Sequence, residues 1–503
     1  MGPSLAVLLT TFALSKLVGP AVAQPPDPWN RTTEAWGRES AAADDLKAAW
    51  QTEPRPAIEQ VLDSWVPSLL EEFPTPGAAV LVLRDGRVIY REFFGDADRA
   101  RRLTITEGTL FNVSSISKTL TAFGVMRLVE EGEIGLDEPI QRYVRRWELP
   151  PSDFDASAVT VRRVLSHTAG LTPGSGAGYG PGDDLPTLED VLSGTAPDRQ
   201  PLLITADPGT GVRYSNGAYG LLQLLIEEVT GRPFAVYMDS AVLRPLAMTS
   251  SAFGDPTAPE IAARIATPHD WLLDPVHPPR LANLAAGGLF TTLDDMGRLA
   301  AAEFYASNSN RTAVVSLDAV RLMHAPVAPS KRFGLGHVIH DGGPVRVVGH
   351  TGLGSGWNAS FQVVPATRDA IVVLTNGDNG YYVHHTIVFA WSAWTVGRPL
   401  GGSVAAQKRL NRLAGVLEFA AEAAAIAVSV TQELAPLVER ASSELEADQP
   451  GAARRSLEEL LELADRFASE GRLSQDALAG IRQHVGGGIG WLQVLEATQS
   501  VRP

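Results

Sequence analysis

The most apolar helical pattern in the chain lies between Phe111 and Glu130. Large apolar residues recur there on every side of a helix, at Leu120, Phe123, Val125, Met126, Leu128 and Val129. A helix without a polar face is normally buried in the middle of a domain. Glu131-Gly132 follows and predicts the end of the helix, because glycine readily adopts the left-handed conformation that closes helices. We therefore expect a turn and then a buried helix over Ser115–Glu130.

Helices and antiparallel strands are predicted on both sides of this helix. Ala57–Phe73 has apolar residues at helical spacing, and we expect Pro67 to kink or end that helix. An Asp-Gly pair between two β-rich runs predicts a hairpin from Ala78–Leu83 and Val88–Phe94. Further runs separated by turns predict an antiparallel meander and a closing helix, over Val345–Gly349, Ser360–Val364, Ala370–Thr375 and Tyr382–Val396.

The composition divides the chain into four segments. Residues 1–23 are typical of a secretory signal peptide, because a short apolar run precedes the small-x-small site Ala21-Val22-Ala23. A positive n-region is missing, so an uncleaved N-terminal anchor stays open as the alternative. Residues 24–56 are predicted to be a linker, 57–400 the main domain, and 401–503 a helical module that packs on that domain or on a partner. We therefore expect an extracytoplasmic protein, periplasmic or secreted.

Charge and composition exclude several classes of function. The 503 residues carry a net charge of −15 at pH 7, which argues against nucleic acid and anionic membranes as partners. The chain has no cysteine, so disulfides, thiolate metal sites and cysteine nucleophiles are excluded. No stretch after the signal segment is long and apolar enough to span a bilayer. We expect no cofactor and no metal, and a small-molecule or peptide substrate.

The first turn of the central helix carries candidate chemistry. Positions i and i+3 share one helix face, so the Ser115 hydroxyl and the Lys118 amine can touch. A hydroxyl is a poor nucleophile until a base takes its proton, and a lysine shielded from water has a lowered pKa and can serve as that base. A chance Ser-x-x-Lys is the alternative, and the apolar surroundings of Lys118 argue against it.

Two further stretches carry polar groups that suit a serine hydrolase. Tyr214 and Asn216 lie in one predicted loop, before a helix expected over Tyr219–Thr230, so both can point into one cavity. A tyrosine beside a lysine ammonium can have a lowered pKa and shuttle protons, and the asparagine amide can orient Lys118 or bind a substrate carbonyl. His350-Thr351-Gly352 is expected to end a strand, where Gly352 lets a substrate lie close.

The three motifs together, in this order, resemble the serine β-lactamase and penicillin-binding fold. Framework stretches such as VTVRRVLSHTAGL, PGTGVRYSNGAYGLL and AAGGLFTTLDDM resemble class C β-lactamases, D-alanyl-D-alanine carboxypeptidases and related esterases. The resemblance covers roughly Ala57 to Leu400. It implies an α+β fold in which an antiparallel sheet is flanked by helices beside an all-helical domain, with the C-terminal helices as an appendage.

The resemblance also implies roles for individual residues. Ser115 would be the acylated nucleophile, and Lys118 with Tyr214 the proton-transfer pair. Substrate would be held by Asn216, His350, Thr351, Gly352 and Leu353, with the N–H groups of Ser115 and Leu353 forming the oxyanion hole. His167 falls in a framework stretch, so we interpret it as structural.

One departure from the family bears on the substrate. Dedicated class C β-lactamases carry lysine where this chain has His350, and a neutral histidine offers no fixed charge to a β-lactam carboxylate. D-amino-acid peptides or amides, β-lactams and small esters therefore all stay open as substrates. A penicillin- or peptidoglycan-binding protein with little turnover is the alternative. No Gly-x-Ser-x-Gly elbow and no His-Glu-x-x-His motif is present.

Overall fold

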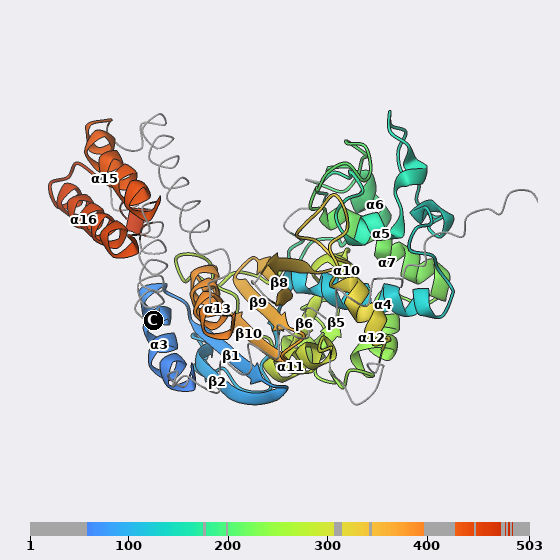
Figure 1. Ribbon diagram of the computed structural model, residues 1–503, viewed down its shortest axis with the longest axis horizontal. Coiled ribbons are helices and arrows are strands. Elements are labelled where there is room, and N and C mark those ends of the chain that lie inside the picture. The colour runs from blue at the N-terminus through green and yellow to red at the C-terminus, as the bar shows by residue number, and fades with distance from the viewer. Residues whose placement is uncertain are drawn as a thin grey trace, which may run out of the picture.

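The protein has a mixed α+β architecture (Figure 1). The computed structural model describes residues 58–473 except 175–177, 198–199, 306–313, 342–344, 397–427 and 447–448, together with 478, 481, 482 and 485. The predicted signal peptide and linker therefore lie outside the described residues. No helix among the residues described is long and apolar enough to cross a membrane.

A seven-stranded antiparallel sheet forms the centre of one half of the molecule. Its order is β3-β2-β1-β10-β9-β8-β7, so the N-terminal hairpin pairs with the C-terminal meander. The predicted hairpin is confirmed, and its turn residues Asp85 and Gly86 both have positive φ, at 50° and 74°. The strands are β1 Gly77–Arg84, β2 Arg87–Asp98, β3 Leu103–Thr104, β7 Val338–Asp341, β8 Arg346–Gly354, β9 Trp357–Val364 and β10 Asp369–Thr375.

Helices cover both faces of this sheet (Figure 1). On one face α3 (Ile58–Glu72) and α13 (Gly380–Val396) pack on apolar residues of β1 and β10. On the other face α11 (Leu293–Ala302) lies against β1, β9 and β10. Pro67 lies inside α3, which continues to Glu72, so the expectation that it could end the helix is wrong.

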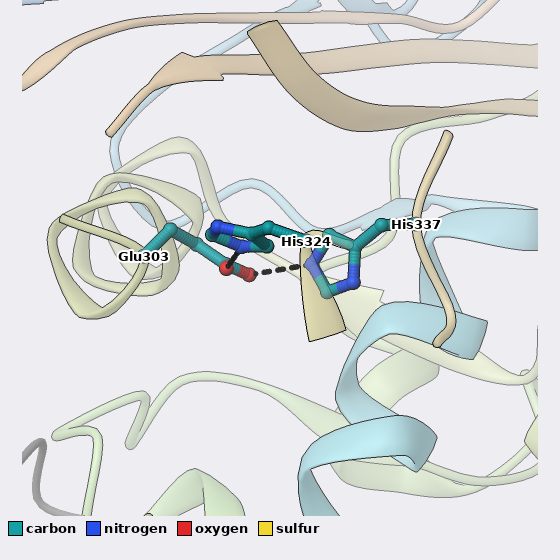
Figure 2. Close-up of side chains that lie close together, drawn as sticks. All are labelled: Glu303, His324 and His337. Atoms are coloured by element: carbon teal, nitrogen blue, oxygen red, sulfur yellow. Dashed lines mark hydrogen bonds and ion pairs between the residues drawn. The ribbon is translucent and has the colours of Figure 1, made fainter. Parts of the chain in front are cut away.

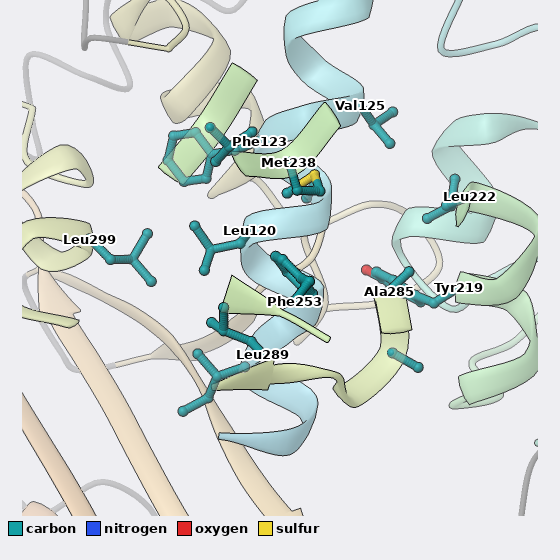
Figure 3. Close-up of a cluster of buried hydrophobic side chains, with 14 of the residues drawn as sticks. Leu120, Phe123, Val125, Tyr219, Leu222, Met238, Phe253, Ala285, Leu289 and Leu299 are labelled. Atoms are coloured by element: carbon teal, nitrogen blue, oxygen red, sulfur yellow. The ribbon is translucent and has the colours of Figure 1, made fainter. Parts of the chain in front are cut away.

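The second half of the molecule is helical and is built around α4 (Ser117–Glu130). Figure 3 shows apolar side chains of the neighbouring helices and short strands gathered around α4, as its apolar pattern predicts. The helix ends as expected, with Gly132 at φ 78°. The other helices of this half are α5 Val161–Leu165, α6 Leu188–Ser193, α7 Asn216–Thr230, α8 Phe234–Met238, α9 Pro259–Ala262, α10 Leu284–Gly287 and α12 Leu317–Met323.

Short elements complete the helical half and join it to the sheet. A small sheet has the order β4-β6-β5, which places β4, just before the turn that contains Ser115, beside β6, just after α10. Its strands are β4 Phe111–Asn112, β5 Ala252–Phe253 and β6 Leu289–Thr291. Four short helical turns are η1 Ser114–Ile116, η2 Ile140–Arg142, η3 Ala156–Ala158 and the π-helical η4 Asp239–Leu243.

The C-terminal helices form a hydrophobic cluster of their own. Helices α15 (Val428–Glu446) and α16 (Pro450–Ser469) lie side by side (Figure 1). The apolar face of the second helix is buried in this cluster, through Leu457, Leu460, Ala464 and Phe467. Residues 401–427, where the composition changes, lie outside the described residues.

Candidate active site

The candidate nucleophile lies in a tight turn directly before the central helix. Ser115 is in the middle of η1, and the preceding residue, Ser114, has a left-handed backbone with φ 43°. That conformation is unfavourable for a residue with a β-carbon and needs support from its surroundings. Asn112 provides it, because its Oδ1 accepts hydrogen bonds from both the N–H and the Oγ of Ser114 at 2.9 Å. The turn is therefore held in a fixed shape.

Lys118 lies one turn further along and reaches the candidate nucleophile. Its Nζ donates to the Ser115 Oγ at 2.9 Å and to the main-chain carbonyl of Ala286 in α10 at 2.8 Å. The side chain is completely buried, and burial lowers the pKa of Lys118 well below its usual value. A neutral amine has a lone pair that can accept the Ser115 proton. The contact expected from the i, i+3 spacing is present.

Tyr214 lies 99 residues further along the chain and also contacts Ser115. Its hydroxyl donates to the Ser115 Oγ at 2.9 Å, and its ring centroid is 5.0 Å from the Lys118 Nζ. Burial raises the pKa of Tyr214 to about 12, and the hydrogen bond with Ser115 offsets this only in part. The expectation of a lowered tyrosine pKa is therefore wrong, because burial of the phenol disfavours its charged form. Tyr214 remains a protonated donor.

Asn216 does not lie in a loop as expected. It is the first residue of α7, which begins three residues earlier than predicted because Ser215 caps it by accepting from the Ala218 N–H. The carbonyl of Asn216 accepts from the Asn283 side chain at 2.8 Å. In the described residues Lys118 is oriented by Ser115 and by the Ala286 carbonyl, so the role expected for Asn216 in orienting it has no support.

The strand β8 forms the other wall of the site. His350 is buried there, and its Nδ1 donates to the Thr351 carbonyl at 2.7 Å. Burial lowers the pKa of His350 to about 3, with a further contribution from Lys118, so its imidazole is neutral at pH 7. The ring centroids of His350 and Tyr214 are 6.2 Å apart. Thr351 is half-buried, and the Leu353 side chain is 56% exposed.

Gly352 lies in close contact with main chain of another segment. A β-carbon at this position would lie 2.8 Å from the Val113 carbonyl carbon and closer still to its oxygen. The main chain directly before Ser115 therefore approaches this glycine. The strand also continues through Gly352 to Gly354, so His350-Thr351-Gly352 does not end it. This close packing brings the strand that bears Leu353 against the residues directly before Ser115.

A family model described as Beta-lactamase matches residues 62–387, well over half of the chain. The chain belongs to the beta-lactamase family. As a member of that family it is a serine hydrolase with the family's α+β fold.

The curated relatives of this beta-lactamase-family chain include an esterase and protein flp. It is 33% identical over 223 residues to esterase EstB of Burkholderia gladioli, an alignment covering 43% of this chain and 56% of the esterase. Protein flp of Staphylococcus aureus is 24% identical over 195 residues, or 39% of this chain and 38% of that protein. The chain thus spans about half the length, or less, of the curated relatives it matches.

Solved structures share the fold over a larger part of the chain. The octameric penicillin-binding protein homologue of Pyrococcus abyssi has a TM-score of 0.57 at 25% identity, covering 70% of this chain and 81% of that one. SurE in its structure with D-Leu has a TM-score of 0.53 at 28% identity, covering 71% and 76%. A class C beta-lactamase, at 22% identity and a TM-score of 0.54, shares the fold, with 66% and 95% covered.

A second polar cluster lies outside the site of this beta-lactamase-family chain (Figure 2). Glu303, His324 and His337 are completely buried, and their ligand-type atoms lie within 4.8 Å of one another, so these groups could hold a metal ion. Hydrogen bonds to the two oxygens of Glu303 already engage the Nε2 atoms of both histidines. The His337 Nδ1 must donate to the Leu335 carbonyl at 2.8 Å, since a carbonyl only accepts.

Hydrogen bonds within the protein can engage the polar groups of this cluster without a metal ion. With both ring nitrogens donating, His337 is an imidazolium paired with the Glu303 carboxylate. Burial lowers the pKa of His337, but the charge and hydrogen bond of Glu303 outweigh burial and raise it overall. Sequence reasoning missed the cluster because its members lie on separate segments and form no short motif.

Proposed function

We propose that the chain hydrolyses uncharged carboxylic esters, and neutral amides more slowly, through an acyl-enzyme on Ser115. The observation that carries this proposal is that the Ser115 Oγ lies 2.9 Å from both the Lys118 Nζ and the Tyr214 hydroxyl. One group can thus accept the nucleophile's proton while the other donates. The family and the partial match to esterase EstB support an acyl-transfer reaction.

In the acylation step, neutral Lys118 accepts the Ser115 proton as the Oγ attacks the substrate carbonyl carbon. The negative oxygen that forms is stabilised by the main-chain N–H groups of Ser115 and Leu353. As the tetrahedral intermediate collapses, the bond to the leaving alkoxide breaks, and Tyr214 gives that alkoxide its proton. The proton held by Lys118 then returns to Tyr214, so both groups regain their starting forms.

In the deacylation step, water attacks the acyl carbon and gives a proton to Lys118. The bond to the Ser115 Oγ breaks, the carboxylic acid leaves, and the proton returns from Lys118 to the serine. This sequence consumes one water and releases one alcohol and one acid, and it needs no cofactor.

The neutral His350 supports the choice of an uncharged substrate. A carboxylate that enters the site gains most from a fixed positive charge, which a lysine provides and a buried imidazole with a pKa of about 3 does not. Lys118 cannot substitute, because its burial favours the neutral amine. Substrates without a free carboxylate facing β8 avoid this penalty.

The test compares two substrates that differ in one charge. We expect kcat/KM for a p-nitrophenyl ester of a neutral acyl group to exceed that for the same ester carrying a carboxylate on the acyl chain by at least about tenfold. Ser115→Ala should abolish turnover of both. The control Thr172→Ser should not, because it keeps the hydroxyl that donates to the Pro201 carbonyl, outside the catalytic set. Retained activity in Ser115→Ala would refute the proposed nucleophile. An equal rate for both esters would refute the charge argument alone.

The alternative is a penicillin-binding protein with little turnover, which the likeness to the Pyrococcus abyssi homologue supports. Incubation with a fluorescent penicillin distinguishes the two, since a stable adduct on Ser115 without product release indicates a binder.

We also propose export through residues 1–23, supported by the apolar run and the Ala21-Val22-Ala23 site. N-terminal sequencing of the exported protein should begin at Gln24, and intact protein in the cytoplasm would contradict this.

A further inference from the structure

His167 occupies a position where a glycine is usual. It follows the last turn of α5, where the Thr168 N–H donates to the Arg163 carbonyl at 2.9 Å and the His167 N–H donates to the Val164 carbonyl at 3.4 Å. These two bonds are the pattern that closes a helix through one left-handed residue. That residue is His167, with φ 59°, whereas Gly194 and Gly231 close α6 and α7. A side chain here is unfavourable for the backbone, so its contacts must compensate.

The contacts of His167 surround Tyr214 along the chain. The carbonyl of His167 accepts from the Arg213 N–H at 2.8 Å, and its ring Nδ1 accepts from the Ser215 N–H at 3.2 Å. Between these two anchors, the Tyr214 ring lies on the imidazole with ring centroids 4.2 Å apart and planes inclined by 34°. One residue therefore holds the main chain on both sides of Tyr214 and also supports its ring.

The His167 ring is itself held on its other sides. It lies 5.4 Å from the ring of Phe333, edge to face, and 5.4 Å from the ring of Tyr219. Because Nδ1 accepts the Ser215 hydrogen bond, the neutral imidazole carries its proton on Nε2. Burial, followed by Lys118 and His350, lowers the pKa of His167 well below its usual value, which favours this neutral form. The imidazole is thus a fixed, neutral support for the Tyr214 ring.

We propose that His167 is a positioning residue that sets the Tyr214 hydroxyl at hydrogen-bond distance from the Ser115 Oγ. The inference rests on the proposed proton-transfer role of Tyr214. Catalytic groups displaced by about 1 Å can cost on the order of 100-fold in rate, so a support of this kind affects the rate without touching the substrate. Sequence reasoning placed His167 in the framework, and the structure adds which framework element it supports.

The test uses two substitutions that suit a left-handed backbone. His167→Gly removes the ring without backbone strain, and His167→Asn keeps a short acceptor for the Ser215 N–H. We expect His167→Gly to lower the acylation rate constant of Ser115 about 10- to 100-fold with KM nearly unchanged. His167→Asn should recover part of that loss. Ala247→Gly is the matched control, because Ala247 is exposed and also has φ 59°, and its rate should equal that of the wild type.

A double-mutant cycle with Tyr214→Phe separates positioning from a general structural role. If His167 acts through the Tyr214 hydroxyl, His167→Gly should cost less than about threefold once that hydroxyl is gone. An equal loss in both backgrounds would overturn the inference and leave the proposed function standing. If Tyr214→Phe alone leaves acylation unchanged, the proposed role of Tyr214 fails, and the inference fails with it.

Discussion

Replacing Gly352 with alanine tests how closely the sheet must approach the nucleophile turn. The added β-carbon would lie 2.8 Å from the Val113 carbonyl carbon, whereas ordinary van der Waals contact begins at 3.4 Å. Strand β8 must therefore withdraw from the turn by at least about 0.6 Å, and by on the order of 1 Å to clear the closer carbonyl oxygen. The obstacle is main chain, so it cannot rotate away as a flexible side chain would.

That displacement moves the Leu353 N–H away from the proposed oxyanion position. We expect kcat/KM for a neutral ester to fall about 100-fold, and the free energy of unfolding to fall by about 1–3 kcal/mol because of the overpacking. Ester hydrolysis, Ser115 labelling by a fluorophosphonate and urea unfolding measure these effects. Gly108→Ala is the control, since a β-carbon there meets nothing closer than 3.9 Å. If Gly352→Ala keeps kcat/KM within about threefold of wild type, the argument that this approach is required is refuted.

Three other predictions concern charge. Since burial lowers the pKa of Lys118, wild-type kcat/KM should rise with pH through a midpoint well below 10.5, and a midpoint at or above 10.5 would contradict this. Lys118→Arg, which stays protonated, should lower kcat/KM about 10³-fold. His350→Lys should speed penicillin acylation about tenfold, and no gain would refute the electrostatic argument. Glu303→Gln should lower the free energy of unfolding by about 3 kcal/mol in urea, whereas the exposed control Glu260→Gln should not change it; equal stabilities would show that the buried cluster contributes nothing.

The elements that the sequence predicts well are those set by local patterns. The turn at Asp85-Gly86 needs two residues with positive φ, and few residue pairs other than Asp-Gly provide them so readily. The central helix is recognisable because its apolar residues have no polar face between them. The apolar pattern predicts the start of α7 too late, because the first turn, with Asn216 and Gly217, lacks apolar periodicity, although Ser215 is a good cap.

The candidate site could be predicted only in part, because its chemistry depends on burial as well as on residue type. The Ser115–Lys118 contact follows from helix geometry alone. Ser115 and Tyr214 are 99 residues apart in the chain, so only the family resemblance predicts that they lie together. The sequence predicts the wrong direction for the pKa shift of Tyr214, because that direction depends on how completely the phenol is shielded from water. Asn112 was missed, since its support of Ser114 depends on a strained backbone angle that no motif records.

The Ala286 carbonyl has a consequence for how this protein can change. It is the second partner of Lys118, yet every amino acid would supply the same oxygen at that position. A substitution at residue 286 leaves this acceptor in place, so a mutational scan reports on the buried side chain of Ala286 and not on the carbonyl that orients the amine. Substitution of the side chain does not remove this hydrogen-bond acceptor, and only a change in the course of the main chain does. Replacement of the 286–287 amide by an ester would weaken that acceptor while leaving every side chain in place.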